Sequence, residues 1–269
     1  MNNLFLHGEG LLPSDGRIRA LTRMIEKIDA DMLVLQEVGS QRTLQTLNEL
    51  LSQPYAHSGL RQGNSERSIH IGVLSKFKLH LTSHRELQLV DDQGAPMLEM
   101  RSAQAAQQNQ PSPARLQRDI LKVEVVVGGQ KISVFCVHLK SRINQTWQIV
   151  DAQTLRQAES RLLADLVQQH LQVEGDHLTV VLGDFNDRPS ADEFRVLTDL
   201  GLHDPQGVQN LSRGRNPTTY WPKRACRFDR ILLCDGALSR LVEHSEVIHN
   251  TTMAKQASDH FPVSLELKV

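Results

Sequence analysis

The sequence predicts one domain in which helices and β-strands are mixed, and three observations indicate it. Short apolar runs rich in Val, Ile and Leu end abruptly in polar residues, as buried strands do; the clearest, 179–182, leads into Gly183 and Asp184. Amphipathic helical patterns lie between several of these runs. A chain of 269 residues buries a sizeable core, and no polar stretch separates two self-sufficient halves. We therefore expect residues 1–269 to form a single domain.

Composition excludes several classes of protein. Lys and Arg number 30 against 31 Asp and Glu, so the formal net charge of -1 gives no global field that would recruit nucleic acid or an anionic membrane. The three cysteines lack C-x-x-C spacing, which argues against a disulfide framework or structural zinc and fits a reducing compartment. No apolar run approaches the roughly 20 residues of a membrane span, and the N-terminus lacks a signal-peptide layout. We expect a monomeric cytoplasmic protein.

The N-terminal half predicts helices and strands in turn. Ser14 and Asp15 are N-cap candidates for a helix that ends near Ala30, because apolar residues recur at helical spacing between them. The pattern then predicts a strand at 31–38, a helix at 43–51 and a strand at 69–74. Residues 91–117 are rich in Gln, Ala and Pro without a sustained period, and we interpret them as a surface insertion or loop.

The C-terminal half begins with a hairpin signal. Two β-rich runs, 120–127 and 131–138, flank Gly128 and Gly129. A helix is predicted at 151–172 with Gly175 as its stop. Further expected elements are the strand that ends at Asp184, a short helix at 192–200, a strand at 226–233, and a last pair of strands that brackets 258–262, with 263–267 alternating like an outer strand.

Polar residues follow the apolar part of five or more predicted strands. Taken alone, a Glu or His there is more often exposed, capping or structurally hydrogen-bonded, and an Asp/Asn pair suits a turn equally well. Together, carboxylates and an amide without thiolates suit Mg²⁺ or Mn²⁺ better than Zn²⁺, and histidines are free to move protons. Phosphoester hydrolysis needs a cation, a base and an acid of this kind. The residues are Glu37, Glu66, His138, Asp184, Asn186, Asp229, Asp259 and His260.

Five motifs in order carry a resemblance to a known family. The chain resembles the endonuclease/exonuclease/phosphatase superfamily, which has the DNase I-like fold. That resemblance implies an α+β fold, a four-layer α/β/β/α sandwich of two mixed β-sheets flanked by helices, with the active site at one edge of the sheets. The motifs are Leu35-Gln36-Glu37-Val38, Val137-His138-Leu139, Gly183-Asp184-Phe185-Asn186, Phe228-Asp229-Arg230-Ile231 and Ser258-Asp259-His260-Phe261-Pro262.

The resemblance also implies how a metal and a water molecule would be held. By position in the family motifs, Glu37 is the main ligand of Mg²⁺ or Mn²⁺. Asp259 is a ligand or a group that supports one. Asp184 and Asn186 would hold the attacking water and the phosphate.

The remaining motif residues would handle protons and phosphate. The resemblance implies that His260, braced by Asp229, is the base or a phosphate partner. His138 would be the general acid, oriented by Glu66, whose place before its strand matches the corresponding acid in DNase-like members. Arg118 matches a family arginine near the phosphate. A surface ion pair or a solvated edge explains Glu66 and Arg118 equally well.

One departure from the family pattern concerns the start of the chain. Members usually begin with a strand that ends in an asparagine, placed just before a segment like Asn3-Leu4-Phe5, and here that strand is expected to be missing. A truncated sequence, a late assigned start or an inactive relative would each account for it. Each buried backbone group left unpaired would cost roughly 1 to 3 kcal/mol. An absent true N-terminus would also hide an export signal.

These observations predict a divalent-metal-dependent phosphoester hydrolase, a nuclease or phosphodiesterase. A basic segment with aromatics, from Arg213 to Arg230, suits gripping phosphates and stacking a base, although a solvated loop explains it as well. One alternative is a phosphomonoesterase or lipid or inositol-phosphate phosphatase with the same metal centre. Another is a non-catalytic binding relative that has lost the first strand.

Overall fold

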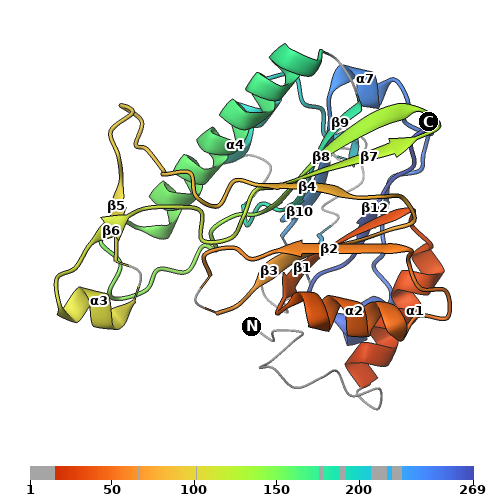
Figure 1. The fold of residues 1–269 in the computed structure, drawn as a ribbon, viewed down its shortest axis with the longest axis horizontal. Coiled ribbons are helices and arrows are strands. Elements are labelled where there is room, and N and C mark those ends of the chain that lie inside the picture. Colours follow the sequence, from red (N-terminus) through yellow and green to blue (C-terminus); the bar gives the residue numbers. More distant parts are fainter. Residues whose placement is uncertain are drawn as a thin grey trace.

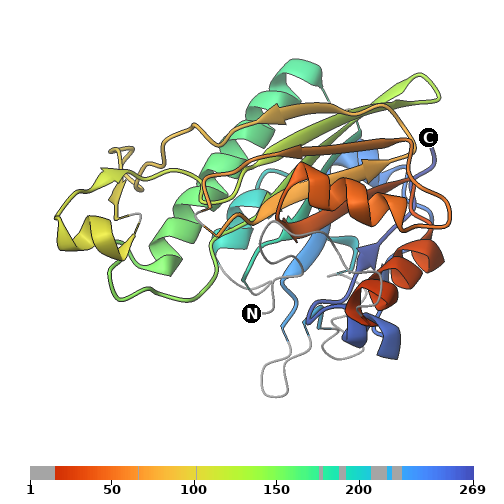
Figure 2. The same ribbon diagram turned by 60° about the horizontal axis from the view of Figure 1, so that its bottom comes forward.

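The structure, a computed structural model, describes residues 16–65, 67–100, 102–175, 178–187, 192–206, 217–219 and 226–269. Figure 1 shows four layers in the order helix, sheet, sheet, helix, and Figure 2 shows the same stacking from a second direction. Helix α4 (Ala152–Glu174) covers one outer face, and helices α1 (Gly16–Ile28) and α2 (Gln41–Glu49) cover the other. The predicted four-layer α+β sandwich is therefore confirmed.

The larger sheet has five strands in the order β10-β9-β8-β7-β4 and is mixed. Strands β8 and β9 are parallel because the long helix α4 connects them, while every other neighbouring pair is antiparallel. The hairpin between β7 and β8 forms as predicted, and its Gly128 and Gly129 both have positive φ. The strands are β4 (His80–Ser83), β7 (Leu121–Val127), β8 (Gln130–His138), β9 (Leu178–Asp184) and β10 (Asp229–Leu233).

The smaller sheet has three strands in the order β1-β3-β2 and is antiparallel throughout. Its strands are β1 (Met32–Val38), β2 (His57–Arg61) and β3 (His70–Ser75). Two mixed sheets were expected; among the described strands the larger sheet is mixed and the smaller is antiparallel, because the central β3 runs opposite to both of its neighbours. Leu44 and Leu47 of α2 pack with Leu74 in the buried cluster between this sheet and its helices.

The main core lies between the two sheets and under α4. Ile71 and Val73 of β3 belong to the same buried cluster as Val123 and Phe135 of the larger sheet. Leu163 of α4 closes that cluster from the outer side. Burial on both faces explains the nearly continuous apolar sequence of β8 and β9.

Short elements complete the chain. Strands β2 and β4, which the sequence patterns did not indicate, lie at the outer edges of the two sheets. The segment 91–117 projects from one end of the molecule in Figure 1 and contains β5 (Leu98–Glu99), α3 (Ala103–Gln107) and β6 (Ser112–Pro113). The last two strands, β11 (Val247–Ile248) and β12 (Val263–Ser264), pair antiparallel and are shorter than predicted. Among the described residues, further short helices are α5 (Asp192–Thr198), α7 (Asp235–Leu238) and α8 (Thr252–Ala257).

Two stretches on which sequence expectations depend lie wholly or mostly outside the described residues. Residues 1–15, on which the expected loss of a first strand depends, lie outside the described residues. The basic segment lies mostly outside them as well, at 213–216 and 220–225. Within the described parts of the chain, no helix combines the length and apolar character that crossing a bilayer requires.

Candidate active site

Three predicted site residues form a row across the larger sheet. His138 ends β8 and Asp184 ends β9, and these two residues are direct partners in the parallel ladder. Asp184 is in turn the direct antiparallel partner of Asp229, the first residue of β10. Because directly paired residues on neighbouring strands share a face of the sheet, all three side chains project to the same side.

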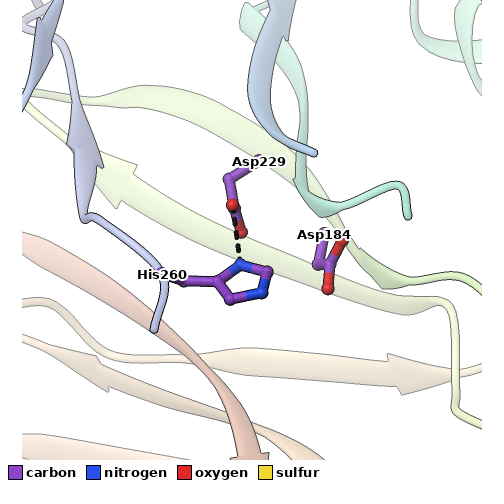
Figure 3. Close-up of side chains that lie close together, drawn as sticks. All are labelled: Asp184, Asp229 and His260. Atoms are coloured by element: carbon purple, nitrogen blue, oxygen red, sulfur yellow. Dashed lines mark hydrogen bonds and ion pairs between the residues drawn. The ribbon is translucent and has the colours of Figure 1, made fainter. Parts of the chain in front are cut away.

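His260 joins this row from a different part of the chain. It precedes β12, and its Nδ1 lies 2.8 Å from Oδ2 of Asp229. Figure 3 shows the Asp184 carboxylate directed toward the other side of the same imidazole. One potential ligand atom from each of Asp184, Asp229 and His260 lies within 4.8 Å of the other two. Residues separated by 76 positions in the sequence thus meet in one cluster.

Asn186 fixes the orientation of the Asp184 carboxylate. Its backbone N–H donates to Oδ1 of Asp184 at 2.8 Å, and its side-chain amide donates to Oδ2 at 3.1 Å. The same amide donates to the carbonyl oxygen of Leu139, 3.0 Å away. Asn186 adopts a φ of 53°, in the left-handed region that non-glycine residues rarely occupy and that concentrates at functional sites. The carboxylate is therefore held from two directions.

Gly183 explains how β9 and β8 come close enough to align these groups. A Cβ at Gly183 would lie 1.9 Å from the carbonyl oxygen of Val137, and the residue has a φ of 140°. Only glycine fits both the contact and the backbone conformation. The close parallel pairing of the two strands therefore requires a glycine at position 183, directly before Asp184.

Glu37 approaches the site from the smaller sheet. It lies near the end of β1, where the pairing with β3 shifts between Leu35 and Val38, and its φ of 58° is left-handed. Such irregularities re-aim side chains near functional sites. Glu37 is outside the Asp184, Asp229 and His260 cluster, but Glu37 and Asp184 both act electrostatically on the guanidinium of Arg118. Arg118 therefore lies within electrostatic range of one carboxylate from each sheet.

Burial gives the cluster an unusual distribution of charge. Burial, followed by the neighbouring charge of Asp229, raises the pKa of Asp184 to about 7. Burial opposes the charged form of His260, but the carboxylates of Asp229, Asp184 and Asp259 outweigh it and raise its pKa to about 10. His260 is therefore an imidazolium at neutral pH, placed between carboxylates.

His138 has the opposite electrostatic environment. Burial lowers its pKa well below the usual value, and the charges of Arg118, His260 and Arg67 lower it further. Its Nε2 lies 3.5 Å from Oδ2 of Asp184. His138 is therefore a neutral imidazole beside an imidazolium, and two histidines in one site differ in protonation at neutral pH.

The sequence matches the model of a known family. That family is the Endonuclease/Exonuclease/phosphatase family, and the match covers residues 3–260. The chain belongs to this family. No protein among the curated sequences matches it significantly.

Solved structures of the family show the same fold at low sequence identity. The human Nocturnin catalytic domain, with bound sulfate anion, has a TM-score of 0.61 and 18% identity over 94% of this chain and 87% of that one. The 3′ phosphatase NExo from Neisseria, bound to product DNA hairpin, has a TM-score of 0.56 and 17% identity, covering 94% and 95%. An AP endonuclease from Archaeoglobus fulgidus has a TM-score of 0.56 and 15% identity, also covering 94% and 95%.

The remaining predicted residues of this family member have mixed placements. Asp259 is half-buried beside His260, and Glu66 lies outside the described residues. Arg118 is only 7% exposed and donates to the carbonyl oxygen of Leu139 at 3.2 Å. Of the described residues in the basic segment, Arg227 pairs with Asp204, and Arg230 is 1% exposed with its guanidinium over the Phe194 ring. These two arginines therefore point into the protein.

Sequence reasoning missed several charged residues around the site. Arg67 is exposed, and its charge reaches both His138 and Arg118. Lys140, Arg156 and Glu159 are almost fully buried behind the site. For Arg156 and Glu159 a signal was present, since they follow Ala152 and precede Leu163 at helical spacing on a face that α4 buries.

The donor set fits a hard divalent cation. Asp184 and Asp229 concentrate carboxylate oxygens from neighbouring strands, and a cation nearby would offset the negative charge that burial disfavours on Asp184, whose pKa is raised. Glu37 brings a further carboxylate toward the same region from the other sheet. All three cysteines are buried and none belongs to the cluster. This chemistry suits Mg²⁺ or Mn²⁺ better than a thiolate-binding metal.

Proposed function

We propose that this chain is a divalent-metal-dependent phosphoester hydrolase and that its preferred substrates are phosphodiesters. The observation that carries the proposal is the cluster of Asp184, Asp229 and His260, with the neutral His138 beside it. Family membership supports phosphoester chemistry, and the site contains the acid, base and carboxylate groups that such hydrolysis needs.

The metal would be held by carboxylates where the end of β1 in the smaller sheet approaches the end of β9 in the larger sheet. In the proposal, Glu37 is the main ligand of Mg²⁺ or Mn²⁺, and Asp259 is a further ligand or a group that supports one. When bound, the cation offsets negative charge on the phosphoryl oxygens. Asp184 and Asn186 hold the attacking water and the phosphate. The Asp184 carboxylate, kept in place by the two Asn186 hydrogen bonds, accepts the proton that the water loses.

The two histidines take different roles because their protonation differs. His260, charged and braced by Asp229, binds a negatively charged phosphoryl oxygen. His138 is neutral without substrate, and the negative charge of a bound phosphate would raise its pKa. His138 then carries a proton when substrate is present and donates it to the leaving oxygen. Glu66 would orient His138, and Arg118 would bind the phosphate.

Nucleic acid is the substrate class that we favour, with phosphomonoesters as the second candidate. Two similar folds are an AP endonuclease and a phosphatase bound to a DNA hairpin. The exposed Arg67, whose charge reaches the site, suits a chain of phosphates. A panel of plasmid DNA, single-stranded RNA, nucleotides, sugar phosphates and inositol phosphates separates the two candidates.

The test uses the purified chain with Mg²⁺ or Mn²⁺. We expect it to nick plasmid and to cleave bis-(p-nitrophenyl) phosphate, and we expect EDTA or Asp184→Ala to abolish both activities. Asp235→Asn is the matched control, because Asp235 forms an exposed carboxylate–histidine pair with His203 away from the cluster. Turnover that survives EDTA and Asp184→Ala would refute the mechanism. No Mg²⁺ binding by calorimetry, with no turnover of any phosphoester, would favour a non-catalytic binding protein.

A further inference from the structure

Two loops that carry site groups lie side by side at the end of the larger sheet. The N–H of Leu139, after β8, donates to the carbonyl oxygen of Asp184 at 2.9 Å. In return, the Asn186 side chain, after β9, donates to the carbonyl oxygen of Leu139 at 3.0 Å. The position of the Asn186 amide therefore depends on where both loops are held.

Helix α4 holds the first loop through the backbone N–H and the backbone carbonyl of one residue, Lys140. Glu159 accepts a hydrogen bond from the backbone N–H of Lys140 at 2.5 Å. Arg156 donates to the carbonyl oxygen of the same residue at 3.3 Å. Arg156 and Glu159 are three residues apart and so project from one side of the helix. Lys140 directly follows Leu139, the residue that accepts from Asn186.

The same arginine holds the second loop. Nε of Arg156 lies 2.7 Å from Oδ2 of Asp187, and its terminal nitrogen lies 2.6 Å from the same oxygen. Asp187 directly follows Asn186, and its backbone carbonyl accepts from the guanidinium of Arg230 at 2.8 Å. One guanidinium therefore connects the loop after β8 to the loop after β9.

This network is buried to a degree that stability alone does not explain. Arg156 is 3% exposed, Glu159 is 2% exposed and Asp187 is 9% exposed. Burying charges carries a large desolvation penalty, and well-packed apolar residues of similar volume are often as stable or more so. A planar guanidinium that donates in several fixed directions does, however, define the geometry of the groups that it binds.

We propose that Arg156 and Glu159 are positioning residues, which set the spacing of the loops after β8 and β9 and so place the Asn186 amide and the Asp184 carboxylate for the reaction. The inference rests on the proposed function for its catalytic consequence. Its structural part, the dependence of the Asn186 amide on Arg156 and Glu159, stands separately. Misplacement of a reacting group by about 1 Å is enough to lower a rate by about 100-fold.

The experiment compares Glu159→Leu, Glu159→Gln and Arg156→Lys with Leu163→Ala. Glutamine keeps an oxygen that accepts from the Lys140 N–H, whereas leucine has similar bulk and no acceptor. Lysine keeps the charge of Arg156 but lacks the fork that reaches both loops. Leu163 is fully buried on the same helix within the main apolar cluster, and Leu163→Ala removes apolar packing while leaving the hydrogen-bonding groups of Arg156 and Glu159 in place.

Two readouts are taken at a temperature at which circular dichroism shows each variant folded. The first is kcat and KM on bis-(p-nitrophenyl) phosphate. We expect kcat to fall about 10-fold or more in Glu159→Leu and Arg156→Lys with little change in KM, and to stay within about threefold in Glu159→Gln and Leu163→Ala. The second is the NMR chemical shift of the Asn186 side-chain amide in metal-free protein. This shift should change in Glu159→Leu and Arg156→Lys and stay the same in Glu159→Gln and Leu163→Ala.

The outcomes separate this inference from the proposed function. An unchanged Asn186 amide in Arg156→Lys and Glu159→Leu, or equal loss of kcat in Leu163→Ala, overturns the positioning role. If Glu159→Leu does not fold, the Arg156→Lys and Glu159→Gln pair decides by the same two readouts. If the wild-type chain cleaves no phosphoester, the proposed function fails, while the amide shift still decides whether the network places Asn186.

Discussion

The imidazole of His260 donates from Nδ1 to Oδ2 of Asp229 across 2.8 Å, although the two residues lie 31 positions apart. This pair keeps a positive charge next to Asp184 at neutral pH, since the pKa of His260 is raised to about 10 against the opposing effect of burial. It also fixes which ring nitrogen faces the site, because Nδ1 is engaged and Nε2 is directed toward Asp184 (Figure 3). A protonated, oriented imidazole in a carboxylate cluster is the electrostatic centre of the site.

Replacement of Asp229 tests this pair. Asp229→Asn should lower the pKa of His260 from about 10 toward the ordinary 6.5. Burial lowers this pKa, and the variant removes the Asp229 charge that raises it. NMR titration of the His260 ring in metal-free protein measures the change. The stability that the raised pKa contributes is fully present below about pH 6.5 and is lost as pH rises through about 10. Asp235→Asn should leave the His260 titration unchanged, and an equally high pKa in Asp229→Asn would contradict the assignment.

Stability should respond to pH through Glu159. Burial raises its pKa from 4.5 to about 7, so between these values the folded chain keeps a proton that the unfolded chain has lost. The free energy of unfolding should therefore decline as pH rises from about 4.5 to about 7, by at most about 1.4 kcal/mol per pH unit from this group. Glu159→Gln removes this contribution. Urea unfolding of both proteins at several pH values measures the difference, and a difference independent of pH would count against it.

Gly183→Ala should damage the site through the fold. The new Cβ would meet the carbonyl oxygen of Val137 at 1.9 Å, so the parallel strands β8 and β9 would have to separate. We expect the free energy of unfolding to fall by about 3 kcal/mol or more. Gly94→Ala is the control, because Gly94 also has a positive φ but no atom within 4 Å of an added Cβ, and it should cost about 1 kcal/mol. Equal losses measured by urea unfolding would show that the close approach does not matter.

Arg118 acts electrostatically on the Asp184 carboxylate and is also the proposed phosphate-binding residue. Its positive charge lowers the pKa of Asp184, so Arg118→Met should raise that pKa further, whereas Arg118→Lys should change it less. Carboxyl ¹³C NMR of Asp184 in metal-free protein measures this effect. If a substrate phosphate also reaches the guanidinium, KM for bis-(p-nitrophenyl) phosphate should rise about 10-fold or more in Arg118→Met. An unchanged KM would leave Arg118 with its hydrogen bond to Leu139 alone.

Most elements were predictable because they depend on local patterns. The helix at 151–172 appears as Ala152–Glu174, and the hairpin around Gly128 and Gly129 forms where the two glycines allow its turn. The edge strands β2 and β4 were not predictable in the same way. Their residues have weak β patterns, and they are ordered by pairing with β3 and β7.

The candidate site likewise has features that the sequence predicts and features that only the tertiary structure shows. The sequence alone identified His138, Asp184, Asp229 and His260 as candidates. Polar residues at the ends of apolar strands can be recognised in a sequence, and these residues match family motifs. The tertiary structure decided that Arg156 and Glu159 lie buried behind them and that the two histidines differ in charge. Burial and the distances between charges set pKa values and contacts, and both arise only when segments far apart in sequence pack together.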